Sequence, residues 1–141
     1  MLRYTLLHPE ILAALGSAGH GSQILIADGN YPFATRAHPH AKRVYLNLAP
    51  GVLSATDVLH VLVDAIPIEA AHVMVPDTGD EPAIFGEFRA RMPERELYIL
   101  RRFEFYDAAC GNDVALVIAT GERRVYANLL LTIGVVPPEV G

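Results

Sequence analysis

Apolar and polar positions follow two rhythms along the chain, one typical of amphipathic helices and one typical of buried strands. Apolar residues recur at helical spacing in four stretches, which predict helices over residues 9–18, 54–66, 83–92 and 103–109. Ser54 stands before the second stretch as a candidate N-cap, and Pro67 ends that helix.

Short continuous apolar runs predict the strands. They fall at residues 23–27, 43–48, 68–75, 96–100, 113–119 and 128–133. Strands that are apolar throughout are buried on both faces, and their alternation with helices predicts an α/β fold, a three-layer α/β/α sandwich with a mostly parallel, mixed sheet. No linker divides the chain, so we expect one domain over residues 1–141. The last strand, with apolar residues behind it, predicts a sheet edge that could pair with another chain.

Composition favours a globular protein, since 52% of the 141 residues are hydrophobic and 19% are charged, unlike chains that stay disordered. No apolar stretch approaches the roughly 20 residues of a membrane span, so we expect no membrane partner. The first residues lack the apolar core and small-residue cleavage site of a signal peptide. A cytoplasmic location is therefore the expectation.

Charge and the rare reactive residues exclude several classes of function. The net charge is −5 and the basic residues form no stripe, so nucleic acid is not an expected partner. Cys110, the only cysteine, excludes an intrachain disulfide and a multi-cysteine zinc site. Lys42, the only lysine, lies in a Pro/His-rich stretch, which argues against Schiff-base and P-loop chemistry.

A first polar cluster lies on both sides of the expected strand 23–27. His20 stands between Gly19 and Gly21, and glycine permits the tight turn that would expose an imidazole. Asp28 follows the strand, at the end where open α/β sheets bind ligands. Taken singly, His20 could also cap the first helix and Asp28 could form a turn. The glycines precede a strand instead of following one, which excludes a dinucleotide-binding site.

A second cluster is the run Arg-Arg-Val-Tyr-Ala-Asn at residues 123–128. In an extended chain Tyr126 and Asn128 project to one face. Carboxylates, amides and arginines beside an aromatic wall suit a polyhydroxyl ligand, and Asp28 and Arg102 would complete such a set. For this cluster alone, an ordinary turn leading into a strand is the alternative.

Six histidines make metal binding a competing interpretation. His38 and His40 lie two residues apart in an irregular segment and could share a cation. His60 and His72 fall inside an expected helix and an expected strand without a carboxylate at ligand spacing, which favours packed or surface roles. We therefore expect no metal site.

At His20, Asp28 and residues 126–128 the sequence resembles the D-ribose pyranase and L-fucose mutarotase family of sugar isomerases. The resemblance covers nearly the whole chain, and it includes Leu-His-Pro-Glu-Ile-Leu at 7–12 and Thr-Gly-Glu-Arg at 120–123. Several motifs in the same order make the similarity specific.

Between the two branches of that family, the run Arg-Phe-Glu-Phe-Tyr at residues 102–106 is similar to the fucose mutarotase side, because the ribose branch carries a histidine there. Asp-Gly-Asn at residues 28–30 departs from the usual fucose sequence. The similarity to the fucose mutarotase branch therefore implies more about the reaction mechanism than about which sugar is the substrate.

The resemblance implies a cofactor-free and metal-free enzyme that interconverts the anomers, or the pyranose and furanose forms, of a reducing sugar such as L-fucose or D-ribose. In the family the histidine matching His20 acts as acid and base. The positions that hold the sugar match Asp28, Arg102, Tyr126, Ala127 and Asn128. A histidine titrates near pH 6.5, so it can accept and deliver protons at neutral pH. A non-catalytic sugar-binding accessory protein of an uptake system is the alternative function, since it would keep the same binding residues.

His20 and Asp28 flank the expected strand 23–27, which at about 3.3 Å per residue separates them by roughly 17 Å. We therefore expect that they do not share a site within one subunit, and that sites form between subunits. This expectation agrees with the ring-shaped homo-oligomers, often decamers, that the resemblance implies.

Overall fold

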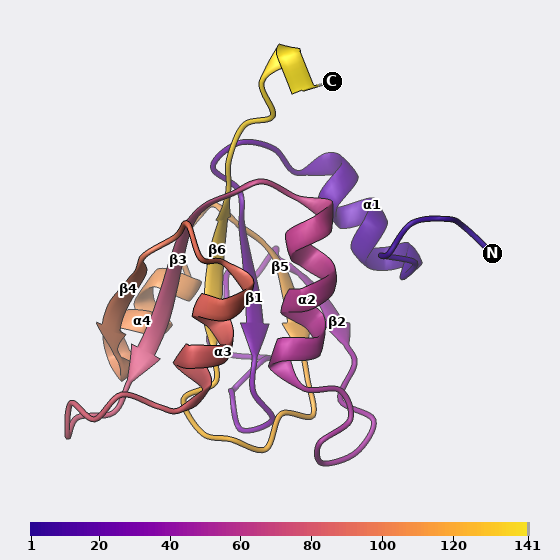
Figure 1. Cartoon of the computed structure of the whole chain (residues 1–141). Coiled ribbons are helices and arrows are strands. Elements are labelled where there is room, and N and C mark those ends of the chain that lie inside the picture. The colour runs from indigo at the N-terminus through magenta and orange to yellow at the C-terminus, as the bar shows by residue number, and fades with distance from the viewer. Residues whose placement is uncertain (141) are drawn as a thin grey trace.

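A six-stranded sheet forms the centre of the molecule, with its strands in the order β2-β5-β1-β6-β3-β4 (Figure 1). The computed structural model describes residues 1–140. The strands are β1 (Gln23–Ala27), β2 (Lys42–Tyr45), β3 (Ile68–Val75), β4 (Leu97–Arg101), β5 (Val114–Ala119) and β6 (Leu129–Ile133). β6 runs antiparallel to both of its neighbours, whereas the pairs β1–β5, β2–β5 and β3–β4 are parallel. The prediction of a mixed, mostly parallel sheet is confirmed.

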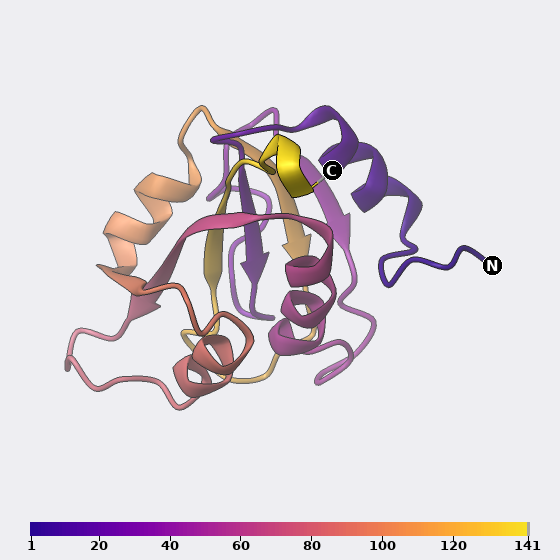
Figure 2. The same cartoon turned by 45° about the horizontal axis from the view of Figure 1, so that its top comes forward.

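Helices cover both faces of this sheet and complete the three layers. They are α1 (Pro9–Ser17), α2 (Ala55–Ala65), α3 (Ile84–Arg91) and α4 (Arg102–Ala109), followed by the 3₁₀ helix η1 (Pro138–Val140). α1, α2 and α3 lie on one face and α4 lies on the other, as Figures 1 and 2 show together. The predicted α/β/α sandwich is therefore confirmed.

The predicted cap of α2 shows how local sequence fixes an element. The Ser54 hydroxyl accepts a hydrogen bond from the Asp57 backbone N–H over 3.0 Å, and the Asp57 carboxylate accepts one from the Ser54 backbone N–H over 3.1 Å. This reciprocal pair satisfies amide groups that the first turn of a helix leaves free. α2 ends at Ala65, just before Pro67, which cannot continue a helix.

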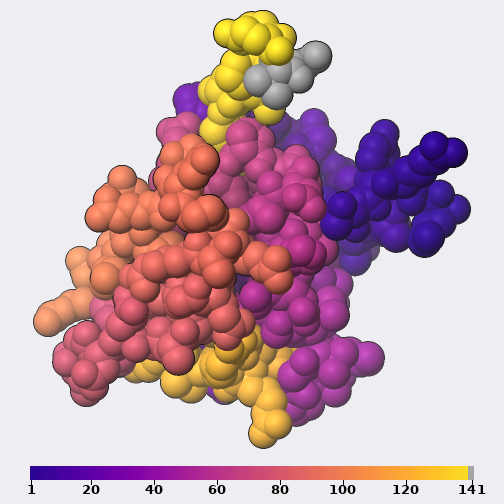
Figure 3. All heavy atoms as spheres, in the orientation of Figure 1, coloured from indigo at the N-terminus to yellow at the C-terminus, as the bar shows by residue number. Residues whose placement is uncertain are grey.

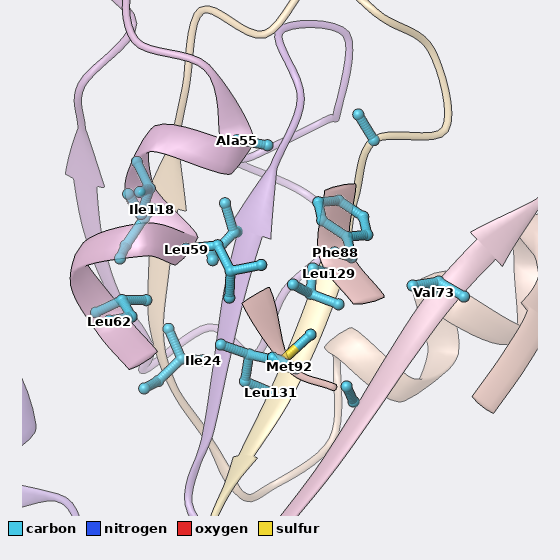
Figure 4. Close-up of a cluster of buried hydrophobic side chains, with 14 of the residues drawn as sticks. Ile24, Ala55, Leu59, Leu62, Val73, Phe88, Met92, Ile118, Leu129 and Leu131 are labelled. Atoms are coloured by element: carbon cyan, nitrogen blue, oxygen red, sulfur yellow. The ribbon is translucent and has the colours of Figure 1, made fainter. Parts of the chain in front are cut away.

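Each face of the sheet buries its own hydrophobic cluster. On the first face Leu59 and Leu62 of α2 and Phe88 of α3 pack against Ile24 and Leu129 of the sheet (Figure 4). The second cluster joins the opposite sides of the same strands to α4 and to the loop after β1, and it includes Leu25, Ala27, Tyr31, Met74, Phe105 and Leu130. Strands that face apolar layers on both sides explain the continuous apolar runs in the sequence.

The expectation that the last strand forms a sheet edge is wrong. β6 lies between β1 and β3 and hydrogen-bonds to both. Four of its five residues are buried, as a strand covered by helices on both faces should be. Position in the chain does not determine position in the sheet, and the edges are β2 and β4.

The two ends of the chain leave the central body. In Figure 3 the first residues stand clear of the rest of the surface, where Met1, Leu2 and Tyr4 are exposed.

Among residues 1–140, none of the helices combines the length and the apolar character that a membrane span requires.

Candidate functional site

A small cavity opens at the carboxyl end of the parallel strands, beside α4. Its volume is about 160 Å³. Its lining comes from the ends of β1 and β3, from α4 and from the segment before β6, and consists of Asp28, Asn30, Tyr31, Met74, Arg102, Tyr106, Val125, Tyr126 and Asn128. The structure thus brings together four of the predicted binding residues at this carboxyl-edge cavity, namely Asp28, Arg102, Tyr126 and Asn128.

Asp28 and Asn128 form the buried polar base of the cavity, with exposed fractions of 2% and 3%. The backbone N–H of Asp28 donates to Oδ1 of Asn128 over 2.7 Å. The Asp28 carboxylate accepts hydrogen bonds from the backbone N–H of Asn30 at 2.9 Å and of Ala127 at 3.2 Å. These bonds fix the polar pair in one geometry before any ligand arrives.

The environment of Asp28 changes its acidity. Burial raises the pKa of the carboxyl, and the hydrogen bonds from the backbone of Asn30 and Ala127 oppose part of that increase. A carboxyl that gains a proton more easily can present either an oxygen lone pair or a hydroxyl proton to a ligand.

The segment before β6 contributes both backbone and side chain. Ala127 is fully buried and does not line the cavity, and its role here is the N–H that it donates to Asp28. Tyr126 has a φ of 57°, in the left-handed region that few residues other than glycine adopt. Such backbone strain gathers at ligand sites, where the surrounding structure holds it in place.

Arg102 and Tyr106 lie one turn apart on α4, so both reach the same side of that helix. The Arg102 guanidinium carbon lies 4.6 Å from the centre of the Phe103 ring. Tyr106 packs edge-on against Tyr31 with 5.4 Å between ring centres. The cavity therefore has a cationic group and an aromatic wall next to its carboxylate.

A clamp around Arg43 holds the loop that carries Tyr31. The Arg43 guanidinium donates to four backbone carbonyls of this loop, those of Phe33, Ala37, His38 and Ala41, at 2.9 to 3.3 Å. The Tyr31 hydroxyl donates to the carbonyl of Arg36 at 2.7 Å. One side chain of β2 thus orders a loop that has no regular secondary structure.

A buried carboxylate anchors the segment between β5 and β6. Glu122 accepts hydrogen bonds from the backbone N–H of Ala55 at 3.1 Å and from the backbone and side chain of Arg124 at 3.0 Å. Burial alone would raise the pKa of Glu122, but these hydrogen bonds hold it below its ordinary value. Arg124 also pairs with Glu87 of α3, so the segment that leads to Tyr126 is tied to α2 and α3.

His20 lies at the opposite end of β1, in the turn that joins α1 to β1. Gly21 has a φ of 86° there, which confirms the glycine-permitted turn, and its N–H donates to the Ile133 carbonyl over 2.9 Å. The His20 side chain is 59% exposed, and its Nε2 lies 2.7 Å from Oε2 of Glu69. Since β1 carries His20 before its first residue and Asp28 after its last, these two side chains lie at opposite ends of the sheet.

Sequence reasoning missed several residues around the site. Tyr31, Tyr106 and Met74 line the cavity, and Glu69 contacts His20. Tyr106 had a signal in its four-residue spacing from Arg102, and Glu69 had one as a charge within an apolar strand. Tyr31 and Met74 look like ordinary core residues, and they are buried on the α4 side of the sheet.

The histidines weighed as metal ligands lie apart from this cavity. His38 and His40 pack against each other with 5.4 Å between ring centres, and Nδ1 of His38 accepts the His40 backbone N–H. His72 is half-buried in β3 against Tyr98. In the part of the chain that the structure describes, no three His, Cys, Asp or Glu side chains gather in a way that could hold a metal ion.

Comparison with known proteins gives consistent matches over most of the chain. The model of a family described as the RbsD / FucU transport protein family matches residues 1–136. A D-ribose pyranase of Bacillus cytotoxicus is 31% identical over 136 residues, which is 96% of this chain and 99% of that protein. A human fucose mutarotase is 31% identical, over 92% of this chain and 90% of the other.

The solved structures that share the fold include two that hold a sugar. The fucose mutarotase of Streptococcus pneumoniae, in complex with L-fucose, has a TM-score of 0.84 and 27% identity, with 97% of this chain and all of the other covered. RbsD of Bacillus subtilis, complexed with D-ribose, has a TM-score of 0.84 and 26% identity over the same shares of the two chains.

Proposed function

The chain belongs to the RbsD / FucU transport protein family, and we infer from its relatives that it is an isomerase, a sugar mutarotase built as a single domain. The relatives named D-ribose pyranase and fucose mutarotase, and the structures that hold L-fucose and D-ribose, support this activity. We propose a reducing monosaccharide of this kind as the substrate.

The observation that carries the proposal is the carboxyl-edge cavity itself. It presents the Asp28 carboxyl, the Asn128 amide, the Arg102 guanidinium and the Tyr126 phenol around a space of about 160 Å³. Vicinal sugar hydroxyls each donate and accept hydrogen bonds, so a mixed set of donors and acceptors suits them. The ring of Tyr106 and the side chain of Met74 supply an apolar wall for the sugar carbons.

The chemistry needs one group that moves protons in both directions, and we assign it to His20. Ring opening removes the proton of the anomeric hydroxyl, breaks the bond between the anomeric carbon and the ring oxygen, and adds a proton to that oxygen. The free aldehyde then rotates and the ring closes on its other face. Neutral imidazole can accept the first proton and imidazolium can deliver the second.

We propose that a second copy of the chain bridges the distance between His20 and Asp28. β1 has five residues, and at about 3.3 Å per residue it separates the two side chains by roughly 17 Å. We propose that His20 of one subunit approaches the carboxyl-edge cavity of its neighbour, in a ring of copies. Tyr98, Ile99 and Phe103 support self-association, because these large side chains are each at least half exposed on β4 and at the start of α4.

A second candidate is a non-catalytic sugar-binding accessory of transport, which the family description as transport proteins favours. Such a protein would bind sugar at the same cavity without any need for His20. The two candidate functions therefore predict different results when His20 is replaced. A mutarotase would lose its catalytic activity, whereas an accessory protein would bind sugar as before.

The test is the rate of anomer exchange, measured by NMR saturation transfer on L-fucose, D-ribose and a panel of other reducing sugars. For a mutarotase we expect acceleration by the wild type and a loss of about 10²-fold or more in His20→Ala, with sugar affinity kept in calorimetric titration. His60→Ala, an exposed histidine of α2, is the matched control and should behave as wild type. Sugar binding without accelerated exchange would instead establish the accessory function.

Complementation tests the shared site. We expect His20→Ala and Asp28→Asn each to be inactive alone, and co-expressed subunits to regain about a quarter of the wild-type activity, the share of interfaces that combine an intact His20 with an intact Asp28. An active monomer in analytical ultracentrifugation, or no recovery in mixed oligomers, would overturn the shared site.

A further inference from the structure

A second and larger cavity opens beside the carboxyl-edge cavity. Its volume is about 470 Å³, and its lining comes from residues 29–30, 47–50 and 120–123. We call it the Arg123 cavity. Asn30 lines both cavities, so the two spaces meet at this residue. A ligand in the carboxyl-edge cavity can therefore extend past Asn30 into the Arg123 cavity.

The boundary between the two cavities is held by the backbone of the turn after β1. The Gly29 N–H donates to the Glu122 carbonyl over 2.9 Å, and a Cβ added at Gly29 would lie 3.1 Å from that same oxygen. The Asn30 backbone N–H donates to Oδ1 of Asp28 over 2.9 Å. The exposed side chain of Asn30 thus starts from a fixed piece of backbone.

Each cavity is lined by one arginine that has no counter-ion. Arg102 lines the carboxyl-edge cavity and Arg123 lines the larger one. Over residues 1–140, neither of them forms an ion pair with a carboxylate, whereas the neighbouring Arg124 pairs with both Glu122 and Glu87. In a chain of net charge −5, two uncompensated arginines at one edge of the sheet make a local positive site that attracts anions.

The side chain of Arg123 lies against the loop that follows β2. Its Cδ would lie 3.6 Å from a Cβ added at Gly51. The Gly51 N–H donates to the Gly121 carbonyl over 2.6 Å, so this loop is tied to the segment that carries Arg123. The contact restricts the side chain of Arg123 where it lines the cavity, which reduces the entropy that binding would cost.

The rest of the lining favours an anion over a second sugar ring. Glu122 is the one carboxylate among the lining residues, and it already accepts hydrogen bonds from Ala55 and Arg124. Its negative charge is therefore compensated within the chain. Residues 29–30, 47–50 and 120–123 include no aromatic side chain against which the face of a second sugar ring could pack.

We propose that the substrate is a reducing sugar with an anionic group, a carboxylate or a phosphate, at the carbon farthest from the anomeric centre, and that Arg123 binds this group. This substrate class rests on the proposed function. The sugar ring lies in the carboxyl-edge cavity, and its charged end passes Asn30 into the Arg123 cavity. Arginine holds carboxylates and phosphates through two parallel N–H···O bonds. The anomeric hydroxyl stays unsubstituted, as ring opening requires.

The test uses sugars that differ only in the group at the far carbon. D-Galactose is compared with D-galacturonate, D-galactose 6-phosphate and a galactose disaccharide linked at C6, and D-ribose is compared with D-ribose 5-phosphate. Saturation transfer measures anomer exchange, with the rate without protein subtracted for each sugar. We expect kcat/KM for an anionic sugar to exceed that for its neutral parent by about tenfold or more, the scale of a hydrogen bond to a charged group. High salt should reduce this ratio, because it screens exposed charges.

Variants of Arg123 assign the preference to one side chain. Arg123→Gln should bring the ratio of kcat/KM for the anionic and the neutral sugar close to one, and Arg123→Lys should keep part of it. Arg91→Gln, at an exposed arginine of the last turn of α3, is the control and should keep the wild-type ratio. Because the ratio compares two sugars on the same variant, a general loss of stability does not change it.

Two kinds of failure are distinguishable. The substrate class alone would be overturned by a kcat/KM for the neutral parents that equals or exceeds that for every anionic sugar, by a preference for the disaccharide, or by an anion preference that survives Arg123→Gln. Failure of the wild type to accelerate exchange of any sugar, L-fucose included, would overturn the proposed function and the substrate class with it.

Discussion

Asn128 accepts a hydrogen bond from the backbone N–H of Asp28 over 2.7 Å, across 100 positions of sequence. The bond joins the end of β1 to the start of β6, and both residues are buried. It therefore serves two purposes at once, because it satisfies a buried backbone donor and it sets the amide that faces the carboxyl-edge cavity.

Asn128→Ala should destabilise the fold and weaken sugar binding together. The substitution leaves the Asp28 N–H buried without an acceptor, which costs about 1–3 kcal/mol. Urea unfolding measures this change in the free energy of unfolding. Asn112→Ala, in the exposed turn before β5, is the control and should stay within about 0.5 kcal/mol of wild type. Equal stability of the two variants would contradict the structural role of Asn128.

Asp28 should make stability depend on pH in a direction set by its raised pKa. A folded pKa above the unfolded value means that the folded chain binds the proton more tightly. The contribution of Asp28 to stability is then complete below the unfolded pKa, near 3.9, and is lost as pH rises through the folded pKa.

The measurement is the free energy of urea unfolding of wild type minus that of Asp28→Asn, from pH 3 to pH 7. This difference should fall as pH rises, by about 1.4 kcal/mol for each unit by which the pKa is raised. A difference that grows with pH would show that the hydrogen bonds to Asp28 outweigh its burial.

The elements and the position of the cavity follow from the sequence because they depend on local patterns. The largely apolar runs at Gln23–Ala27 and Ile68–Val75 match β1 and β3 in full, since the fully buried positions of both strands are apolar and the polar side chains of β3 lie at positions that are exposed or partly exposed. Asp28 and Asn128 meet because each stands at a strand terminus, and the carboxyl ends of the parallel strands meet the amino end of antiparallel β6.

Strand order and long-range partners could not be predicted in the same way. The placement of β6 between β1 and β3 depends on packing over the whole sheet. The apolar pattern of β6 alone is therefore compatible with a strand at the edge of the sheet as well as with a strand at its centre. The register shift of β3 between Ile68 and Ala70 likewise arises only from its pairing with β6. The hydrogen bonds of Arg43 could not be predicted from the sequence either, because their acceptors are backbone carbonyls that any sequence provides.

Arg43→Lys should loosen the loop that carries Tyr31 without unfolding the protein. Lysine keeps the charge but lacks the planar fork that lets arginine reach four carbonyls. We expect faster hydrogen exchange by mass spectrometry over residues 31–41 and a stability loss of about 1–3 kcal/mol. Arg91→Lys, exposed at the end of α3, should change neither quantity. If hydrogen exchange in the loop is unchanged, then the packing of Tyr31 against its aromatic neighbours, and not Arg43, keeps the loop ordered.

Two glycine-to-alanine substitutions should change stability in opposite directions. A Cβ at Gly121 would lie 2.5 Å from the Val52 carbonyl oxygen and closer still to that of Ala49. The Gly121 N–H donates to Leu53 and the Gly121 carbonyl accepts from Gly51, so neither stretch of backbone can move away without breaking these bonds. Gly121→Ala should therefore cost about 3 kcal/mol, the upper range for overpacking.

Gly86 in α3 has no atom within 4 Å of the position that a Cβ would take, so Gly86→Ala should stabilise the fold by about 0.5–1 kcal/mol through helix propensity alone. Thermal unfolding of Gly121→Ala and of Gly86→Ala, each compared with the wild type, measures both changes in stability. Because residues 120–123 lead directly to Tyr126, Gly121→Ala should also weaken sugar binding, whereas Gly86→Ala should leave it unchanged. A tolerated alanine at Gly121 would mean that the segments around residues 49–53 and 121 are not held against each other as the structure has them.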